Sequence, residues 1–142
     1  MIVVDTNVIS ELMRPDPDLT VIAWVSGQPL GSLATTAINV AEIRVGLARL
    51  RDGARKVALS AAAEGVFSGL KELIWSFDAH SAQEYATVVA HRESIGRPIS
   101  GFDAQIAAVC RSRGAAIATR NVDDFSDLGL EVIDPWQSRQ PR

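Results

Sequence analysis

The sequence predicts an α/β protein in which helices cover both faces of a parallel β-sheet. Short apolar segments rich in β-branched residues alternate along the 142-residue chain with longer segments of helical periodicity. No internal repeat or low-complexity linker interrupts this alternation. Strand–helix–strand units favour parallel pairing, because each helix carries the chain back to the end of the sheet where the next strand starts.

In the first half of the chain, proline and glycine separate the expected elements. Ile2-Val3-Val4 is short and apolar, which is typical of a strand buried on both faces. Asp5 or Thr6 can cap the helix that follows, and Pro15-Asp16-Pro17 breaks that helix. The expected elements are, in order, a strand at 2–4, a helix to about Met13, a helix from Asp18 to about Gly27, a strand at 32–35 and a helix at 37–50.

The second half continues the alternation with three more strands. Ser81 and Glu84 have the spacing of a capping box, which predicts a helix start, and Gly114 is typical of a helix end. The expected elements are a helix across 59–70, a strand at 73–77, a helix from Ser81 to about Gly96, a helix from Ser100 to Gly114, a strand at 115–119, a helical turn at 121–125 and an edge strand at 130–133. We therefore expect one domain over residues 1–136 and a flexible C-terminal tail over 137–142.

The helix at 37–50 is more apolar than a single packing surface requires. Its apolar residues form two stripes, one of Ile38, Ala41, Val45 and Ala48 and the other of Val40, Ile43, Leu47 and Leu50. We expect one stripe to face the sheet and the other a partner chain, which favours a homodimer.

Composition excludes several classes of protein. The net charge of −3, from 14 basic and 17 acidic residues, argues against indiscriminate coating of nucleic acid. A single cysteine, Cys110, rules out an internal disulfide and disfavours a cysteine-based zinc site. No apolar run reaches the roughly 18 residues of a membrane span, and no basic segment precedes the apolar start. We therefore expect a cytoplasmic protein with no membrane partner.

Four acidic residues stand close to the ends of expected strands or the starts of helices. Asp5 follows the first strand, Glu42 lies early in the helix after the second, Asp103 opens the helix before the fourth, and Asp124 follows the fourth. Each also has a local explanation, because Asp5 can be an N-cap and the other three end segments that resemble capping boxes. For any one residue, capping is the stronger interpretation.

The conjunction of the four acids changes that balance. The carboxyl ends of parallel strands meet at one edge of the sheet, where Asp5, Glu42 and Asp124 all map. Two carboxylates about 5 Å apart at an effective dielectric constant near 20 repel by about 3 kcal/mol, which exceeds the stabilisation that one helix cap contributes. A bound divalent cation, or protonation of some of the acids, relieves that repulsion. Oxygen ligands without thiolates or a histidine cluster favour Mg²⁺ or Mn²⁺.

The chain resembles the PIN-domain proteins, in particular the VapC/FitB-type toxins of bacterial type II toxin–antitoxin systems. The resemblance covers nearly the whole chain, from Ile2 to Trp136, and its segments are specific only in combination. They are Val3-Val4-Asp5-Thr6-Asn7-Val8, Ala41-Glu42-Ile43-Arg44-Val45-Gly46-Leu47, Pro98-Ile99 ahead of Asp103-Ala104-Gln105-Ile106-Ala107-Ala108, Ala118-Thr119-Arg120-Asn121-Val122-Asp123-Asp124-Phe125 and Val132-Ile133-Asp134-Pro135-Trp136.

The resemblance implies a three-layer α/β/α fold with a five-stranded parallel sheet in the order 3-2-1-4-5. It also implies a Mg²⁺-dependent ribonuclease in which Asp5, Glu42 and Asp103 match the three principal acids. Spacing alone does not place Asp103 beside the others, whereas the resemblance does. Asn121 stands where the family often has a fourth aspartate; Asp124 is our candidate replacement, and this departure leaves open whether one metal ion binds or two.

Residue roles follow from the same resemblance. Asp5 and Asp103 would bind Mg²⁺ directly, and Glu42 and Asp124 would bind through water or hold a second ion. Thr6 and Thr119 would hydrogen-bond the carboxylates or the phosphate, and Arg120, with Arg44 as a weaker candidate, would meet the RNA backbone. The implied partners are an RNA substrate, a second copy of the chain and a small antitoxin that blocks the acidic pocket with a basic side chain.

Two other classes of function remain open from the sequence. A haloacid-dehalogenase-like phosphatase also begins with an aspartate after its first strand, although its motif requires a second aspartate where this chain has Asn7. A non-catalytic PIN-fold module would act mainly by binding an antitoxin or a second copy of itself.

Overall fold

The computed structural model describes residues 1–138, and residues 139–142 of the expected tail lie outside the described part. Its helices are α1 (Thr6–Met13), α2 (Leu19–Ser26), α3 (Ala37–Ala48), α4 (Ala54–Leu70), α5 (Ala79–Ser94) and α6 (Gly101–Arg113). Its strands are β1 (Ile2–Val4), β2 (Leu33–Thr36), β3 (Ile74–Trp75), β4 (Ala116–Ala118) and β5 (Val132–Ile133). Two short 3₁₀ helices, η1 (Lys71–Leu73) and η2 (Val122–Phe125), are the remaining helical elements of residues 1–138.

The strands form one parallel sheet in the order β3-β2-β1-β4-β5, which confirms the predicted fold class and strand order. β1 lies at the centre, with Val3 opposite Ala34 of β2 on one side and Ile117 of β4 on the other. The chain moves outward from β1 to β3 and then crosses to β4. The gap beyond the carboxyl ends of β1 and β4 is therefore the switch point at which parallel sheets of this kind bind ligands.

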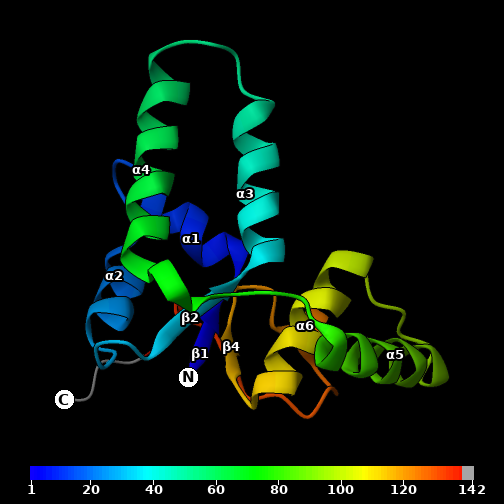
Figure 1. Cartoon of the computed structure of the whole chain (residues 1–142). Coiled ribbons are helices and arrows are strands. Elements are labelled where there is room, and N and C mark those ends of the chain that lie inside the picture. Colours follow the sequence, from blue (N-terminus) through cyan, green and yellow to red (C-terminus); the bar gives the residue numbers. More distant parts are fainter. Residues whose placement is uncertain (139–142) are drawn as a thin grey trace.

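Alternate residues of the central strands pack into two separate hydrophobic cores, one on each face of the sheet. Val3 and Ile117 pack with α5, α6 and the buried Phe125 on one face. Val4 and Ala118 pack with residues of α1, α2, α3 and α4 on the other. Successive strand side chains point to opposite faces, so a strand of three buried residues supplies both cores. The result is the three-layer arrangement of Figure 1, with α5 and α6 on one side of the sheet and the remaining helices on the other.

Helices α3 and α4 stand side by side and extend beyond the sheet, with α1 near their base (Figure 1). Ile43 of α3 is buried, and Val40 and Leu47 pack against the same core. Ile38 packs against the core on the opposite face of the sheet, whereas Val45 stays 47% exposed. The stripe of Val40, Ile43 and Leu47 thus packs within this chain, whereas Ala41, Val45 and Ala48 of the other stripe are exposed.

Helix α4 begins at Ala54, ahead of the helix expected across 59–70, and the caps of two other helices differ from the sequence prediction. Helix α5 begins at Ala79 with Asp78 as its N-cap, so the capping box predicted at Ser81 and Glu84 is wrong. Helix α3 begins at Ala37, and its capping box joins Thr36 to Asn39 instead of Asn39 to Glu42. Both errors have the same cause: an earlier polar side chain already satisfies the free backbone N–H groups of the first turn. Within residues 1–138, no helix has the length and apolar character needed to cross a bilayer.

Candidate metal centre at the switch point of the sheet

A cavity of about 600 Å³ opens beyond the carboxyl ends of the central strands. It is bounded by α1, by α3 and by the start of α6, and three of the four predicted acids, Asp5, Glu42 and Asp103, line it. Arg120, which is predicted to meet the RNA backbone, and Asn121 line the same cavity. The fold therefore collects most of the predicted site around one opening.

Asp5 lies at the bottom of this cavity and is only 4% exposed. It is the N-cap of α1, where its Oδ1 atom accepts a hydrogen bond from the Thr6 backbone N–H at 2.8 Å. Oδ1 also accepts from the Asn39 side-chain amide at 3.0 Å, and Oδ2 accepts from the Thr119 hydroxyl at 2.7 Å. A carboxylate has about four acceptor positions, so these three bonds fix its orientation and leave Oδ2 able to accept once more.

Asn39 is a site residue that sequence reasoning took for a helix cap. It is fully buried, and its amide donates to Asp5 and, at 3.0 Å, to the Thr6 hydroxyl. Its Oδ1 atom accepts from the Thr36 backbone N–H at 3.3 Å, which closes the capping box of α3, and from the Thr36 hydroxyl at 2.7 Å. One side chain thus ties the start of α3 to the start of α1, beneath the carboxylates.

Glu42 and Thr6 form the next contact outward. The Thr6 hydroxyl donates to Glu42 Oε1 at 2.9 Å while it accepts from Asn39. Thr6 therefore bridges the α3 acid to the network that holds Asp5.

Burial and mutual repulsion raise the pKa of all three acids that line the cavity. Burial is the main cause at Asp5, where hydrogen bonds from Thr119, Thr6 and Asn39 oppose the rise and Asp124 adds to it. Burial also raises the pKa of Glu42, with further contributions from Asp5 and Asp103. At Asp103, burial, Asp5 and Asp124 raise the pKa, whereas a hydrogen bond with Ser100 and the charge of Arg92 lower it. The charges of neighbouring acids therefore contribute to the raised pKa of each of the three.

Asp124 occupies a different position from the other three acids. It is exposed, belongs to η2 and lines an adjacent cavity of about 420 Å³ together with Asp123 and Asn121. Its charge nevertheless contributes to the raised pKa values of Asp5 and Asp103. Asn121 lines both the main cavity and the cavity beside Asp124.

Thr119 and Asn7 connect β4 to the start of α1. Besides its bond to Asp5, the Thr119 hydroxyl oxygen accepts from the Asn7 amide at 3.2 Å and from the Asn121 backbone N–H at 3.1 Å. The Asn7 Oδ1 atom accepts from the Arg120 backbone N–H at 3.2 Å. Asn7, which spacing did not assign to the site, therefore holds the loop after β4 in register with Asp5.

The predicted arginines have different surroundings. The Arg120 guanidinium lies 5.0 Å from the ring centroid of Trp136 at the rim of the main cavity, in position to meet an anion. Arg44 instead pairs with Glu64 at 2.8 Å and stacks over Phe67, bridging α3 to α4. The structure therefore gives Arg44 an intramolecular role and leaves Arg120 as the stronger candidate for a substrate contact.

The donor chemistry of the site fits a hard divalent cation. Asp5, Glu42, Asp103 and Asp124 offer only oxygen atoms, and the buried Cys110, whose pKa burial raises to about 12, is no thiolate ligand. Within residues 1–138, no group of three or more histidine, cysteine, aspartate or glutamate side chains is already drawn together closely enough to hold a metal ion. The ligand types therefore suit Mg²⁺ or Mn²⁺, while the carboxylates stand apart in this structure.

Comparison with known proteins identifies the family. Residues 2–130 match the PIN domain. VapC ribonuclease Y4jK of Sinorhizobium fredii is 39% identical over 138 residues, which cover 96% of this chain and 99% of that protein. Toxin FitB of Neisseria gonorrhoeae is 36% identical over 140 residues, covering 96% of this chain and 99% of that protein. The crystal structure of FitAcB from Neisseria gonorrhoeae matches with a TM-score of 0.90 at 34% identity and covers 97% of this chain and all of that one. The chain belongs to the PIN domain family, within which it is similar to toxins of the VapC/FitB type.

Proposed function

We propose that this protein is a Mg²⁺-dependent endoribonuclease toxin of a type II toxin–antitoxin pair, with Mn²⁺ as an alternative ion. The observation that carries the proposal is the group of three buried or half-buried carboxylates around one cavity at the switch point of the sheet. Carboxylates with raised pKa values in a cleft are typical of a functional site. The similarity to a protein named VapC ribonuclease favours RNA as the substrate.

In this proposal each carboxylate has a defined task. Asp5 and Asp103 bind the ion directly, and Glu42 and Asp124 bind it through water or hold a second ion. When bound, the ion supplies a water of lowered pKa and stabilises negative charge on the phosphoryl oxygens. Thr6, Thr119 and Asn39 keep Asp5 and Glu42 oriented, since each donates a hydrogen bond to one of these carboxylates.

The rim of the cavity favours an anionic polymer as substrate. The Arg120 guanidinium is held against Trp136 and its backbone is tied to Asn7, so its position is fixed before any ligand arrives. Arginine in such a setting suits contact with a phosphodiester. Asn121, on the same loop, lines both cavities and would contact the substrate beside Arg120.

Cleavage assays with the purified chain test this proposal. We expect Mg²⁺-dependent cleavage of a mixed-sequence RNA, its loss in EDTA, and no hydrolysis of a generic phosphomonoester. Hydrolysis of the phosphomonoester with RNA left intact would instead support the phosphatase. Sequencing the RNA ends formed in cells that express the chain would identify the target and the cleaved sequence.

A second candidate is a module that binds partners without catalysis. The observation that favours it is the separation of the carboxylates, which within residues 1–138 form no ready metal-holding group. Calorimetry separates the two candidates. We expect heat of binding when Mg²⁺ is added at millimolar concentration, and the absence of binding would favour the module.

We also propose an antitoxin partner and a homodimer. The main cavity continues into a groove of about 610 Å³ between α1 and α4, lined by Met13, Arg55, Leu59 and neighbouring apolar residues. Such a groove suits an antitoxin segment whose basic side chain reaches the acids.

Val45, exposed on α3, is the residue to test for the dimer: light scattering should give a dimer for the wild type and a monomer for Val45→Glu. Because its substrate is RNA, we place the protein in the cytoplasm.

We also propose that the domain ends at residue 136. Trp136 packs against the core beneath α1 and α4 and supports Arg120, so a chain ended before it would lose both contacts. A chain ended at residue 136 should keep the melting temperature and RNA cleavage of the full-length protein.

A further inference from the structure

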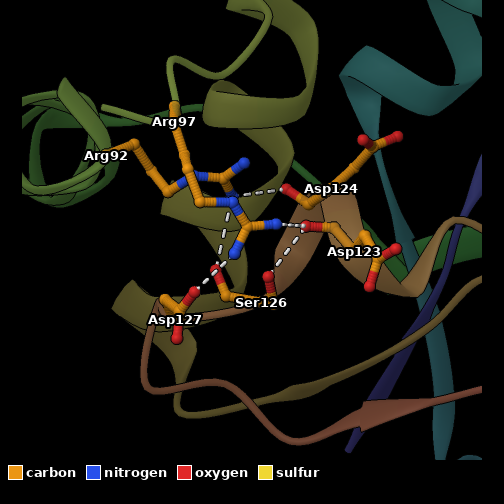
Figure 2. A network of polar contacts seen from close by, with 6 residues as sticks. All are labelled: Arg92, Arg97, Asp123, Asp124, Ser126 and Asp127. Carbon is orange, nitrogen blue, oxygen red and sulfur yellow. Dashed lines mark hydrogen bonds and ion pairs between the residues drawn. The ribbon is translucent and has the colours of Figure 1, made fainter. Parts of the chain in front are cut away.

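Two arginines, Arg92 and Arg97, bind the turn that carries Asp124 (Figure 2). We infer that Arg92 and Arg97 form an arginine clamp that positions residues 123–127, and with them the Asp124 carboxylate, at the edge of the metal centre. The inference rests on the proposed role of Asp124 in metal binding. It assigns a positioning function to two residues that do not touch the cavity themselves.

Arg92 is the inner part of the clamp. It lies in the last turn of α5 and is only 4% exposed. Its Nη1 atom donates to the carbonyl oxygens of Asp124 at 2.9 Å and Ser126 at 3.3 Å, and its Nε atom donates to the carbonyl of Arg97 at 2.7 Å. Within residues 1–138, no carboxylate lies within ion-pair distance of Arg92. A buried charge is costly unless it is well hydrogen-bonded, so these carbonyl positions are tightly constrained.

Arg97 is the outer part of the clamp. Its Nη1 atom donates to Asp127 Oδ2 at 2.7 Å, and its Nη2 atom reaches the Asp123 carbonyl at 3.5 Å. Asp127 has a φ of +62°, a conformation that residues other than glycine rarely adopt. The Arg97–Asp127 pair is about half exposed and contributes little to global stability. Its effect is local, because it holds the turn in a backbone conformation that the chain alone disfavours.

The clamp contacts Asp124 only through its backbone carbonyl and leaves the Asp124 carboxylate free. Figure 2 shows the Asp124 carboxylate turned away from both guanidinium groups, whereas the Asp124 carbonyl faces Arg92. An arginine that paired with the carboxylate would neutralise it and compete with a cation. Binding to the carbonyl fixes the position of Asp124 and keeps its charge available, which is the arrangement expected of a residue that orients a ligand.

Hydrogen exchange of the metal-free, full-length protein tests the clamp without reference to catalysis. The turn has its own hydrogen bonds, from the Asp124 N–H to the Asn121 carbonyl and from the Ser126 N–H to the Asp123 carbonyl. In Arg92→Met we expect these two amides to exchange about tenfold faster or more, because hydrogen bonds to a charged group are lost. Arg111→Met is the matched control, since Arg111 binds Glu84 and the Leu128 carbonyl farther along the same loop. The control should leave both amides unchanged; unchanged exchange in Arg92→Met would overturn the clamp.

Manganese affinity, measured by electron paramagnetic resonance, tests the link to Asp124. We expect Arg92→Met to weaken Mn²⁺ binding roughly 10- to 100-fold, as for other residues that orient metal ligands. In an Asp124→Asn background the same substitution should cause no further loss. A loss that persists in that background would overturn the assignment to Asp124. No Mn²⁺ binding by the wild type would contradict the proposed function instead, and the exchange result would still decide whether the clamp exists.

Arg97→Ala keeps the inference testable if Arg92→Met does not fold, because Arg97 is about half exposed. We expect faster exchange at Ser126 and weaker Mn²⁺ binding, each by a smaller factor than in Arg92→Met, with a melting temperature close to that of the wild type. Wild-type values of both quantities would overturn the role of Arg97.

Discussion

Asp5 and Asp78 have the same local role and opposite electrostatics. Each follows a strand of the sheet and caps the next helix, Asp5 through the Thr6 N–H and Asp78 through the Ser81 N–H and hydroxyl. Asp5 is buried beside other acids and its pKa is raised. Asp78 is exposed, and hydrogen bonds from Ser81 lower its pKa. The difference lies in what the fold packs around each cap, since Asp5 faces Asn39 and Thr119 from distant segments.

Substitution of the two aspartates should give the largest contrast. We expect Asp5→Asn to reduce Mg²⁺-dependent RNA cleavage by about 10³-fold or more, because metal-based charge stabilisation is worth several kcal/mol in the transition state. Asp103→Asn should do the same. Asp78→Asn should cleave at the wild-type rate, measured on one RNA under single-turnover conditions.

Circular dichroism is the control for folding in these variants. Wild-type cleavage by both Asp5→Asn and Asp103→Asn would contradict the assigned metal centre. Loss of cleavage in a folded Asp78→Asn protein would show that a cap alone supports activity, and the comparison would fail.

This contrast marks how far the sequence predicts the molecule. The strand order and helix positions follow from periodicity and the family resemblance, and they agree with the structure. Asp5 and Glu42 are predictable because strand ends and early helix turns collect at one edge of a parallel sheet. Asp103 needs the resemblance, since no strand directly precedes its helix. The strand end at Asp78 has the same form as that at Asp5, so local pattern cannot separate a site from a cap.

The residues that sequence reasoning missed act over long separations. Asn39 reaches Asp5 across 34 positions, and Arg92 reaches the carbonyls of Asp124 and Ser126 across 32 and 34 positions. Nothing in the residues next to Arg92 indicates that its guanidinium is buried. A charged residue in a helix has no local signature that reveals such partners.

Removing the side chains that hydrogen-bond the two aspartates should give the same contrast as substituting the aspartates themselves, with smaller effects. Asn39→Ala removes a hydrogen bond to buried Asp5 and leaves the Thr36 hydroxyl without its acceptor. We expect a loss of about 2–3 kcal/mol of stability and a roughly 10- to 100-fold weaker Mn²⁺ affinity. Ser81→Ala, the equivalent change at Asp78, should lower stability and leave Mn²⁺ affinity unchanged. Urea denaturation and Mn²⁺ titration measure the two quantities, and equal Mn²⁺ affinities would refute the role of Asn39.

The pH dependence of stability should have opposite signs at the two aspartates. The folded-state pKa of Asp5 lies above 3.8, so between these values the folded state binds more protons than the unfolded state. The stability contributed by Asp5 is therefore complete below pH 3.8 and is lost as pH rises through the folded-state pKa. For Asp78, whose pKa is lowered from 3.8, stability is present above that pH and is lost as pH falls.

Melting temperatures in EDTA between pH 3 and 8 check these signs. At pH 7, Asp5→Asn should melt above the wild type, and the gain should shrink as pH falls and vanish below pH 3.8. Asp78→Asn should melt slightly below the wild type at pH 7, and that loss should vanish below pH 3.8. Added Mg²⁺ should raise the melting temperature of the wild type at pH 7 and have no effect on Asp5→Asn. Shifts of the same sign in both variants would mean that burial does not distinguish the two caps.

The smallest effect is expected at Asn121, where the buried acids meet the exposed turn. Asn121 lines both cavities, and its backbone N–H donates to the same Thr119 hydroxyl oxygen that binds Asp5. Asn121→Asp adds a carboxylate at this junction without moving the backbone, so Mn²⁺ affinity should rise by about tenfold or less, as for one added charge near the surface. The same change in an Asp124→Asn background should restore much of the affinity lost with Asp124, because either position can then supply the fourth carboxylate. If Asn121→Asp rescues nothing, Asp124 acts from its own position in η2, and the exposed turn contributes to the metal centre independently of Asn121.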